Sequence, residues 1–184
     1  MLTSSASLEP ESHILKDGTR VVIRPILPED ADDLQATFKR LSVESIYLRF
    51  HSFKKELPDQ EAHDLATLDY TTRMAFVAIC YENGQELVVG VARYALLDLA
   101  KPDMAESAVV VADEYQNRGI GKLLLRRLVT YARAKGIGQL RGNLQVGNTR
   151  MLDLVRRSGL PNKTRYVEGI WEATIDLGVS DEGT

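Results

Sequence analysis

A short loop around Gly119 and Gly121 contains the residues of this sequence whose types point to anion binding. It lies in the stretch YQNRGIGKLLL, between an apolar strand pattern and a helical pattern. Free backbone N–H groups at residues 117–122 would point outward at the positive end of the helix dipole, and glycine lets an anion approach closely. Arg118 and Lys122 add positive charge where a helix N-terminus disfavours it unless an anion lies opposite. The loop therefore predicts a phosphate or diphosphate site; a structural strand-to-helix turn is the alternative.

Two familiar nucleotide-binding glycine patterns do not fit this loop. The pattern GxxxxGK[ST] would require glycine at Gln116 and serine or threonine at Leu123. The pattern GxGxxG would require a third glycine at Leu124. The loop therefore belongs to neither of these classes of nucleotide site.

The tripeptide GIG recurs at residues 136–138, in a different setting. Here a long helical pattern with a basic last turn comes before the glycines, and a strand pattern follows them. Glycine is the usual residue for the left-handed position after a helix, and cationic side chains suit the negative end of the helix dipole. We expect Gly136 to end a helix without any ligand.

Hydrophobic periodicity predicts the elements that position both loops. Period-two alternation and short apolar runs predict strands within residues 17–27, 74–81, 86–97, 106–112, 139–146 and 169–177. Helical spacing and capping residues predict helices within residues 28–41, 42–50, 57–69, 120–135 and 149–159. This order predicts a single α/β (α+β) domain over residues 14–178, with a mixed, mostly antiparallel central sheet flanked by helices. Residues 1–13 and 179–184 are expected to be flexible tails.

Bulk composition limits the classes of partner. The formal net charge is −3, which argues against nucleic acid as the main partner. No apolar run approaches the ~20 residues that span a bilayer, and the first residues lack the features of a signal peptide. We therefore expect a cytoplasmic protein without a membrane partner.

The cysteine and histidine residues do not point to a reactive or metal site. The single Cys80 lies in an apolar run and is expected to be a buried small hydrophobe. The three histidines show no metal-ligand spacing, so no metal is expected.

The stretch VVVADEYQNRGIGKLLL resembles the coenzyme A loop of the GNAT superfamily of N-acetyltransferases, whose motif is [RQ]xxGx[GA]. The following helix, the strand QLRGNLQV and the helix NTRMLDLVRRSGL also resemble that family in their order. The segment LKDGTRVVIRPILPEDADDLQATFKRLSVESIYLRFHSF resembles the start of bacterial protein-lysine acetyltransferase GNAT domains, which are fused elsewhere to cyclic-nucleotide-binding or acyl-CoA-synthetase-like domains. The resemblance covers nearly the whole chain. Because only about fifteen residues precede it, we do not expect control by cyclic nucleotide to carry over.

The resemblance implies a GNAT-like fold with acetyl-CoA as co-substrate. It implies that one strand pairs its backbone with the pantetheine arm as an added strand would, and that the loop holds the diphosphate. A residue in the last helix would also reach the coenzyme, although an N-cap role explains it equally well. The implied contacts are Val109, Val110 and Val111 on the strand, Gln116, Asn117, Arg118, Gly119, Ile120, Gly121 and Lys122 in the loop, and Asn148 in the helix.

Acetyl transfer to an amine requires a base, because a lysine ammonium (pKa ~10.4) must lose a proton before it can attack. Glu106 is the candidate, since strand alternation places it on one face with Ala108 and Val110. The resemblance also places the catalytic glutamate on this strand. We expect Glu106 to be semi-buried beside apolar neighbours; a solvent-facing residue at a strand end is the alternative.

The leaving coenzyme A thiolate raises a second question. Many GNAT enzymes carry a tyrosine in the last helix, in a pattern like NxxAxxLY, but counting from Asn148 puts Val155 there. Tyr115 and Tyr166 are the possible substitutes. A thiol with pKa ~8.5 leaves with little help, so the general acid stays unassigned.

These observations predict an acetyl-CoA-dependent N-acetyltransferase that transfers the acetyl group directly, in a ternary complex, to lysine side chains of proteins such as acyl-CoA synthetases. One alternative is a small-molecule amine N-acetyltransferase, because one scaffold serves many acceptors. Another is a non-catalytic acyl-CoA-binding sensor, which would have no need of a base such as Glu106.

Overall fold

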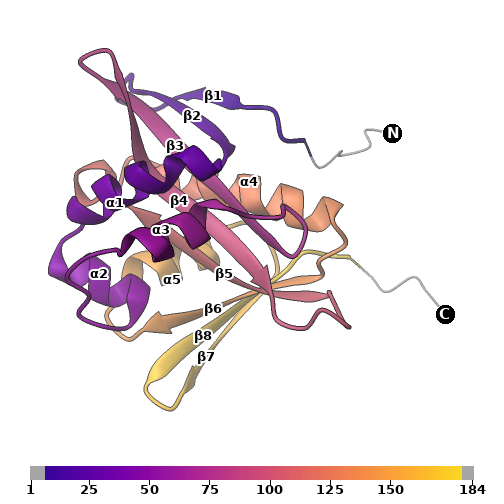
Figure 1. Ribbon diagram of the computed structural model, residues 1–184. Helices are drawn as coiled ribbons and strands as arrows, with labels where there is room; N and C mark the ends of the chain where they lie inside the picture. Colours follow the sequence, from indigo (N-terminus) through magenta and orange to yellow (C-terminus); the bar gives the residue numbers. More distant parts are fainter. Residues whose placement is uncertain (1–6, 180–184) are drawn as a thin grey trace.

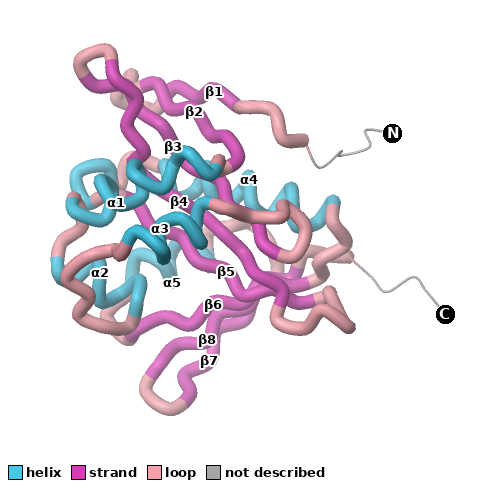
Figure 2. The backbone as a smooth tube through the Cα atoms, viewed as in Figure 1, coloured by secondary structure: helices cyan, strands magenta, loops and turns pink. Residues whose placement is uncertain are grey.

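The computed structural model describes residues 7–179, which form an eight-stranded sheet with helices on both faces (Figures 1 and 2). The strands are β1 (Glu11–Ile14), β2 (Arg20–Pro25), β3 (Arg73–Glu82), β4 (Gln85–Leu96), β5 (Met104–Val111), β6 (Gln139–Gln145), β7 (Asn162–Val167) and β8 (Ile170–Asp176). The helices are α1 (Ala31–Lys39), α2 (Val43–Phe50), α3 (Asp59–Ala66), α4 (Ile120–Ala134) and α5 (Thr149–Arg156). The strand order is β1-β2-β3-β4-β5-β6-β8-β7, and every pair except β5–β6 is antiparallel. The predicted mixed, mostly antiparallel sheet flanked by helices is confirmed.

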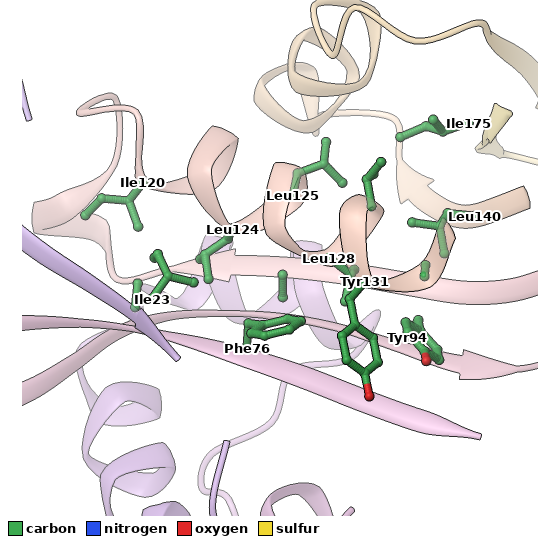
Figure 3. Close-up of a cluster of buried hydrophobic side chains, with 14 of the residues drawn as sticks. Ile23, Phe76, Tyr94, Ile120, Leu124, Leu125, Leu128, Tyr131, Leu140 and Ile175 are labelled. Atoms are coloured by element: carbon green, nitrogen blue, oxygen red, sulfur yellow. The ribbon is translucent and has the colours of Figure 1, made fainter. Parts of the chain in front are cut away.

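Alternation along the central strands divides the core between the two faces of the sheet. Met74 and Phe76 of β3 belong to the cluster under α4, whereas Ala75 and Val77 belong to the cluster under α1, α2 and α3. Figure 1 shows these three helices in front of the sheet and α4 behind it. The predicted apolar stripe of α4 is confirmed, because Ile120, Leu124 and Leu128 lie against the sheet (Figure 3). Ala132 belongs to the same buried cluster.

An ion pair fixes the entry to α1. Arg24, at the end of β2, donates to both carboxylate oxygens of buried Asp30 at 2.7 Å. Asp30 also accepts the backbone N–H of Leu27 at 2.7 Å. A buried carboxylate is stable only when it is paired and hydrogen-bonded in this way. The segment RPILPED therefore has a structural role in this chain, in the turn between β2 and α1.

The structure contains two strands that the sequence patterns did not predict, β1 and β7. Strand β1 corrects the expected tail over residues 1–13, because residues 11–13 pair with β2. The buried guanidinium of Arg127 on α4 donates to the carboxylate of Glu11 and to the carbonyl oxygens of Ser7 and Glu9, so packed structure extends back to Ser7. Residues 1–6 and 180–184, the rest of the expected tails, lie outside the described residues.

The neighbouring strands β5 and β6 pair only over a short stretch. Their parallel register covers Met104↔Gln139, Ala105↔Leu140 and Glu106↔Arg141. Beyond Glu106, β5 keeps its β4 partners through Val111 but has no β6 partner. The two strands therefore diverge, and the backbone edge of β5 from residue 107 to 111 is open in the middle of the sheet.

Candidate functional site

A cavity of about 480 Å³ occupies the wedge between β5 and β6. One wall is the open edge of β5, and the opposite wall comes from β6 and β8. The start of α4 and the loop before it close one end, while α5 and three residues of α2, Ser45, Leu48 and Arg49, complete the lining. The cavity thus joins the predicted anion loop to the predicted coenzyme strand. The predicted contacts on its wall are Val109, Val110, Val111, Gln116, Asn117, Gly119, Gly121, Lys122 and Asn148.

The loop has the backbone conformation of an anion site. Asn117 (φ 60°) and Gly119 (φ 94°) both adopt left-handed conformations, and α4 begins directly afterwards. Within the described chain, the N–H groups of residues 117–122 donate to no backbone or side-chain acceptor. Successive free N–H groups at a helix N-terminus form a concave site for phosphate. Lys122, exposed on the wall of the cavity, adds positive charge to it.

Three of the predicted loop contacts take positions that limit what their side chains can do. The side chain of Ile120 is buried in the core, and the residue lies outside the cavity lining. Arg118 lies over the ring of Tyr115 at 5.0 Å and pairs with Asp17 at 3.5 Å, outside the cavity lining. Gln116 donates to the carbonyl oxygen of Val111 at 2.9 Å, so it ties the loop to the end of β5.

Asn148 caps α5, because its side chain accepts the backbone N–H of Met151 at 3.2 Å. The same residue lines the cavity. Its cap role is therefore established, and its position also suits the second role, contact with the coenzyme.

The second GIG tripeptide ends α4, as predicted. Gly136 has φ 82°, and its N–H donates to the carbonyl oxygen of Arg133 at 3.0 Å. The N–H of Ile137 donates to the carbonyl oxygen of Ala132 at 3.0 Å. These two bonds form a Schellman motif, which satisfies the last carbonyl groups of the helix.

Glu106 is the last residue of β5 that pairs with β6, at the point where the wedge opens. By alternation it shares a face with Ala108 and Val110, which lie against α1 and α2. Its side chain is exposed, so the expected semi-burial is wrong. Arg49 of α2 lies within electrostatic reach of the Glu106 carboxylate. The helices leave this strand end open to solvent, which is where an amine on a large acceptor could approach.

Of the two substitute tyrosines, Tyr115 lines the cavity and Tyr166 does not. Val155, at the position of the family's tyrosine, is buried and lines the cavity. Tyr115 donates its hydroxyl to Glu82, and burial together with this hydrogen bond raises the pKa of Tyr115 to about 12. Tyr166 is exposed on β7, where it packs against Trp171. The Tyr115 hydroxyl is therefore engaged by Glu82, and the Tyr166 hydroxyl lies outside the cavity lining.

The sequence patterns missed Asn143 of β6, which lines the cavity. Its Oδ1 atom is buried and has no hydrogen-bond partner among residues 7–179. A buried polar atom normally has such a partner, so this oxygen is available to a donor group in the cavity. Strand alternation could have placed Asn143 on a face, but only the divergence of β5 and β6 turns that face into a cavity wall.

No group of three or more histidine, cysteine, aspartate or glutamate side chains in residues 7–179 could hold a metal ion. Among the helices described, none is both long enough and apolar enough to cross a membrane. Cys80 is free and buried, as predicted, and burial raises the pKa of its thiol.

The family model for the acetyltransferase (GNAT) family matches residues 40–160, which include β5, the glycine loop, α4, β6 and α5. The chain belongs to the GNAT acetyltransferase family. As a member it is an acetyl-CoA-dependent N-acetyltransferase.

Relatives of this chain also carry the names of acetyltransferases or GNAT domains. Acetyltransferase PA5475 of Pseudomonas aeruginosa is 36% identical over 140 residues, which cover 76% of this chain and 74% of the relative. Acetyltransferase Pat of Mycolicibacterium smegmatis is 29% identical over 156 residues, or 84% of this chain, but this chain spans only 45% of Pat. The GNAT domain of S. lividans PAT superposes with a TM-score of 0.81 and 26% identity over 91% of this chain and 96% of that domain.

Proposed function

We propose that this acetyltransferase modifies lysine side chains of other proteins, acyl-CoA synthetases among them, by direct transfer from acetyl-CoA in a ternary complex with Glu106 as general base. The observation that carries the proposal is the path of β5. Its open edge runs from Val111, near the loop, back to Ser107, and Glu106 follows as the last residue paired with β6. An extended pantetheine arm beside this edge would bring its thioester to the Glu106 end.

The proposed acetyl transfer needs only one general base. Glu106 takes a proton from the lysine ammonium, directly or through one water, and the neutral amine attacks the thioester carbonyl carbon. A C–N bond forms, the C–S bond breaks, and the electron pair of the C–S bond goes to sulfur. The remaining extra proton on nitrogen neutralises the thiolate. Because a thiol has pKa ~8.5, this step proceeds without a tyrosine at position 155.

A protein acceptor is supported by the surface around Glu106. The carboxylate is exposed at a strand end instead of enclosed in a pocket, so an acceptor does not have to enter the molecule. The loop that follows α2, the helix that carries Arg49, presents Phe53, 74% exposed and stacked on Tyr47 with 4.8 Å between ring centroids. Exposed aromatic side chains of this kind are favourable contacts for a protein partner.

The test has two parts. Mass spectrometry of acyl-CoA synthetases incubated with the enzyme and acetyl-CoA should show acetylated lysines, whereas acetylation of small amines alone would support the alternative acceptor class. Glu106→Gln should lower kcat by about 10²–10⁴-fold with little change in the KM for acetyl-CoA, the range for loss of a general base. The matched control is Glu86→Gln on β4, an exposed glutamate beside Tyr81 that should keep full activity. Full turnover by Glu106→Gln would exclude this residue as the base.

A further inference from the structure

Two arginines face the acceptor side of β5 without a carboxylate partner. Arg49 of α2 and Arg93 of β4 line a second, small cavity of about 40 Å³ together with Ala108 and Val110. The remaining lining is almost entirely apolar. Arg49, Ala108 and Val110 also line the coenzyme cavity, so the two cavities meet at β5. Even the smaller one has room for a water molecule or a carboxylate group.

These arginines differ from the other partly buried arginines of the chain. Arg24, Arg40, Arg127 and Arg141 each form an ion pair with a carboxylate. Across residues 7–179, no carboxylate forms an ion pair with Arg49 or Arg93. Unpaired charges that are partly buried are costly to a folded chain, which suggests that their partner comes from outside.

The contacts of Arg93 leave most of its hydrogen-bonding capacity unused. Its Nη2 donates to the carbonyl oxygen of Leu65, near the end of α3, at 3.1 Å. Guanidinium carries five N–H donors, so this contact occupies only part of the group. The planar guanidinium is also the side-chain group that best matches a carboxylate.

The surrounding charges favour an anion beside Arg93. Burial, reinforced by the positive charges of Arg49 and Arg73, lowers the pKa of Arg93 to about 9. Burial also lowers the pKa of Arg49, and the negative charges of Glu106 and Glu61 oppose that shift. Glu106 and Glu61 thus partly compensate Arg49, whereas the charges that act on Arg93 are positive.

The small cavity lies a short distance from the proposed base. Arg93 pairs directly with Ala108 across β4 and β5, and Ala108 is two residues from Glu106 on the same face. Two residues span about 7 Å along a strand. An anion bound at Arg93 would therefore lie about 7 Å along the strand from the position of Glu106. Consecutive Cα atoms of a peptide are ~3.8 Å apart, so this spacing matches a side chain one or two positions from the acceptor lysine.

We propose that Arg93, assisted by Arg49, binds a carboxylate of the acceptor, and that the enzyme selects lysines flanked within two positions by aspartate or glutamate. This inference rests on the proposed lysine acetylation at Glu106. A free amino acid could offer the same chemistry through its own α-carboxylate, and the experiment includes it as a separate arm.

The experiment compares two peptides that differ only in a glutamate or glutamine next to a single lysine. The wild-type enzyme should show a kcat/KM about 10- to 100-fold higher for the glutamate peptide, the range for a hydrogen bond to a charged group. In Arg93→Gln the ratio should fall to within about twofold of one, and Arg93→Lys should restore part of it. Arg126→Gln, an exposed arginine on the outer side of α4, is the matched control and should keep the wild-type ratio.

A binding measurement keeps this test independent of turnover. Calorimetry of both peptides with the protein and coenzyme A should show the same preference for the glutamate peptide, lost in Arg93→Gln. Equal binding of the two peptides, or an unchanged preference in a folded Arg93→Gln, would overturn the inference. Arg93-dependent acetylation of free glutamate, without discrimination between the peptides, would also overturn it in favour of the α-carboxylate. Preferential binding without any acetylation would retain the anion site and reject the proposed function.

Discussion

Gly90 of β4 lies in close contact with the carbonyl oxygen of Val110 on β5. A Cβ atom added at Gly90 would be 3.0 Å from that oxygen and 3.1 Å from the Cδ1 atom of Leu124 on α4. The first neighbour is backbone, which cannot move aside without shifting the strand. Gly90 therefore sets how closely β4, β5 and α4 approach one another beside the coenzyme cavity.

This contact predicts that Gly90→Ala lowers the free energy of unfolding by about 1–3 kcal/mol, the usual effect of overpacking. The displaced β5 edge should also raise the KM for acetyl-CoA. Urea unfolding and steady-state kinetics measure the two effects. Gly147→Ala is the control, because a Cβ there meets no atom within 4 Å and stability should change by less than ~0.5 kcal/mol. Equal stability of the two variants would show that β5 tolerates the shift.

The two glycines of the coenzyme loop should respond differently to alanine. Gly119 has φ 94°, a conformation that costs a residue with a Cβ roughly 1–2 kcal/mol. Gly119→Ala should therefore weaken acetyl-CoA binding about 5- to 30-fold, as measured by KM. At Gly121 the new Cβ would meet Leu154 at 3.6 Å, an ordinary contact, and binding should change less than ~3-fold. A larger effect at Gly121 than at Gly119 would contradict this account.

Lys122 should contribute binding energy that depends on salt. Because its ammonium is exposed at the start of α4, Lys122→Met should raise the KM for acetyl-CoA about 3- to 10-fold at low ionic strength. The difference from wild type should shrink as salt is added. Arg126→Met, one turn further along α4, removes the same charge away from the loop and should leave the KM unchanged. Titration of the KM against sodium chloride concentration checks this.

Asp69, before β3, should make stability depend on pH in the acid range. Burial opposes the shift, but hydrogen bonds from Thr72 Oγ1 and from the N–H groups of Thr71, Thr72 and Arg73 outweigh it and lower the pKa of Asp69 to about 2. A lowered pKa stabilises the fold above the ordinary value of 3.8, and this contribution is lost as pH falls from 3.8 toward 2.

Asp69→Asn should therefore be less stable than wild type at pH 7, by only ~1 kcal/mol because the side chain is exposed to solvent screening. Urea unfolding at pH 7, 4 and 2 should show this difference disappearing at the lowest pH. Asp153→Asn, an exposed aspartate on α5, serves as the control. A constant difference across this range would assign the loss to something other than the carboxylate charge.

The sequence predicted those elements whose periodicity reflects a buried face. Strands β3, β4 and β5 carry apolar runs, and α4 carries an apolar stripe, so their ranges agree with the structure to within a few residues. Strands β1 and β7 lie at the two edges of the sheet and are polar. Their pairing depends on β2 and β8, and for β1 also on Arg127, contacts that a local pattern does not contain.

The candidate site was predictable to the extent that it depends on local backbone. The left-handed turn of the glycine loop and the alternation of Glu106 with Ala108 both follow from nearby residues. The exposure of Glu106, the unsatisfied oxygen of Asn143 and the unpaired charge of Arg93 depend on which helices cover which strands. Such features arise from contacts between distant segments, so the sequence pattern alone could not reveal them.

The divergence of β5 from β6 also bears on solubility. An unpaired strand edge is a template for association with other chains, and here the edge at residues 107–111 lies inside the sheet instead of at its border. Coenzyme bound along this edge, as the proposed function requires, would cover it and stabilise the fold by mass action. The supply of coenzyme A in the cell would then influence how much of this protein stays dispersed, as well as how fast it works.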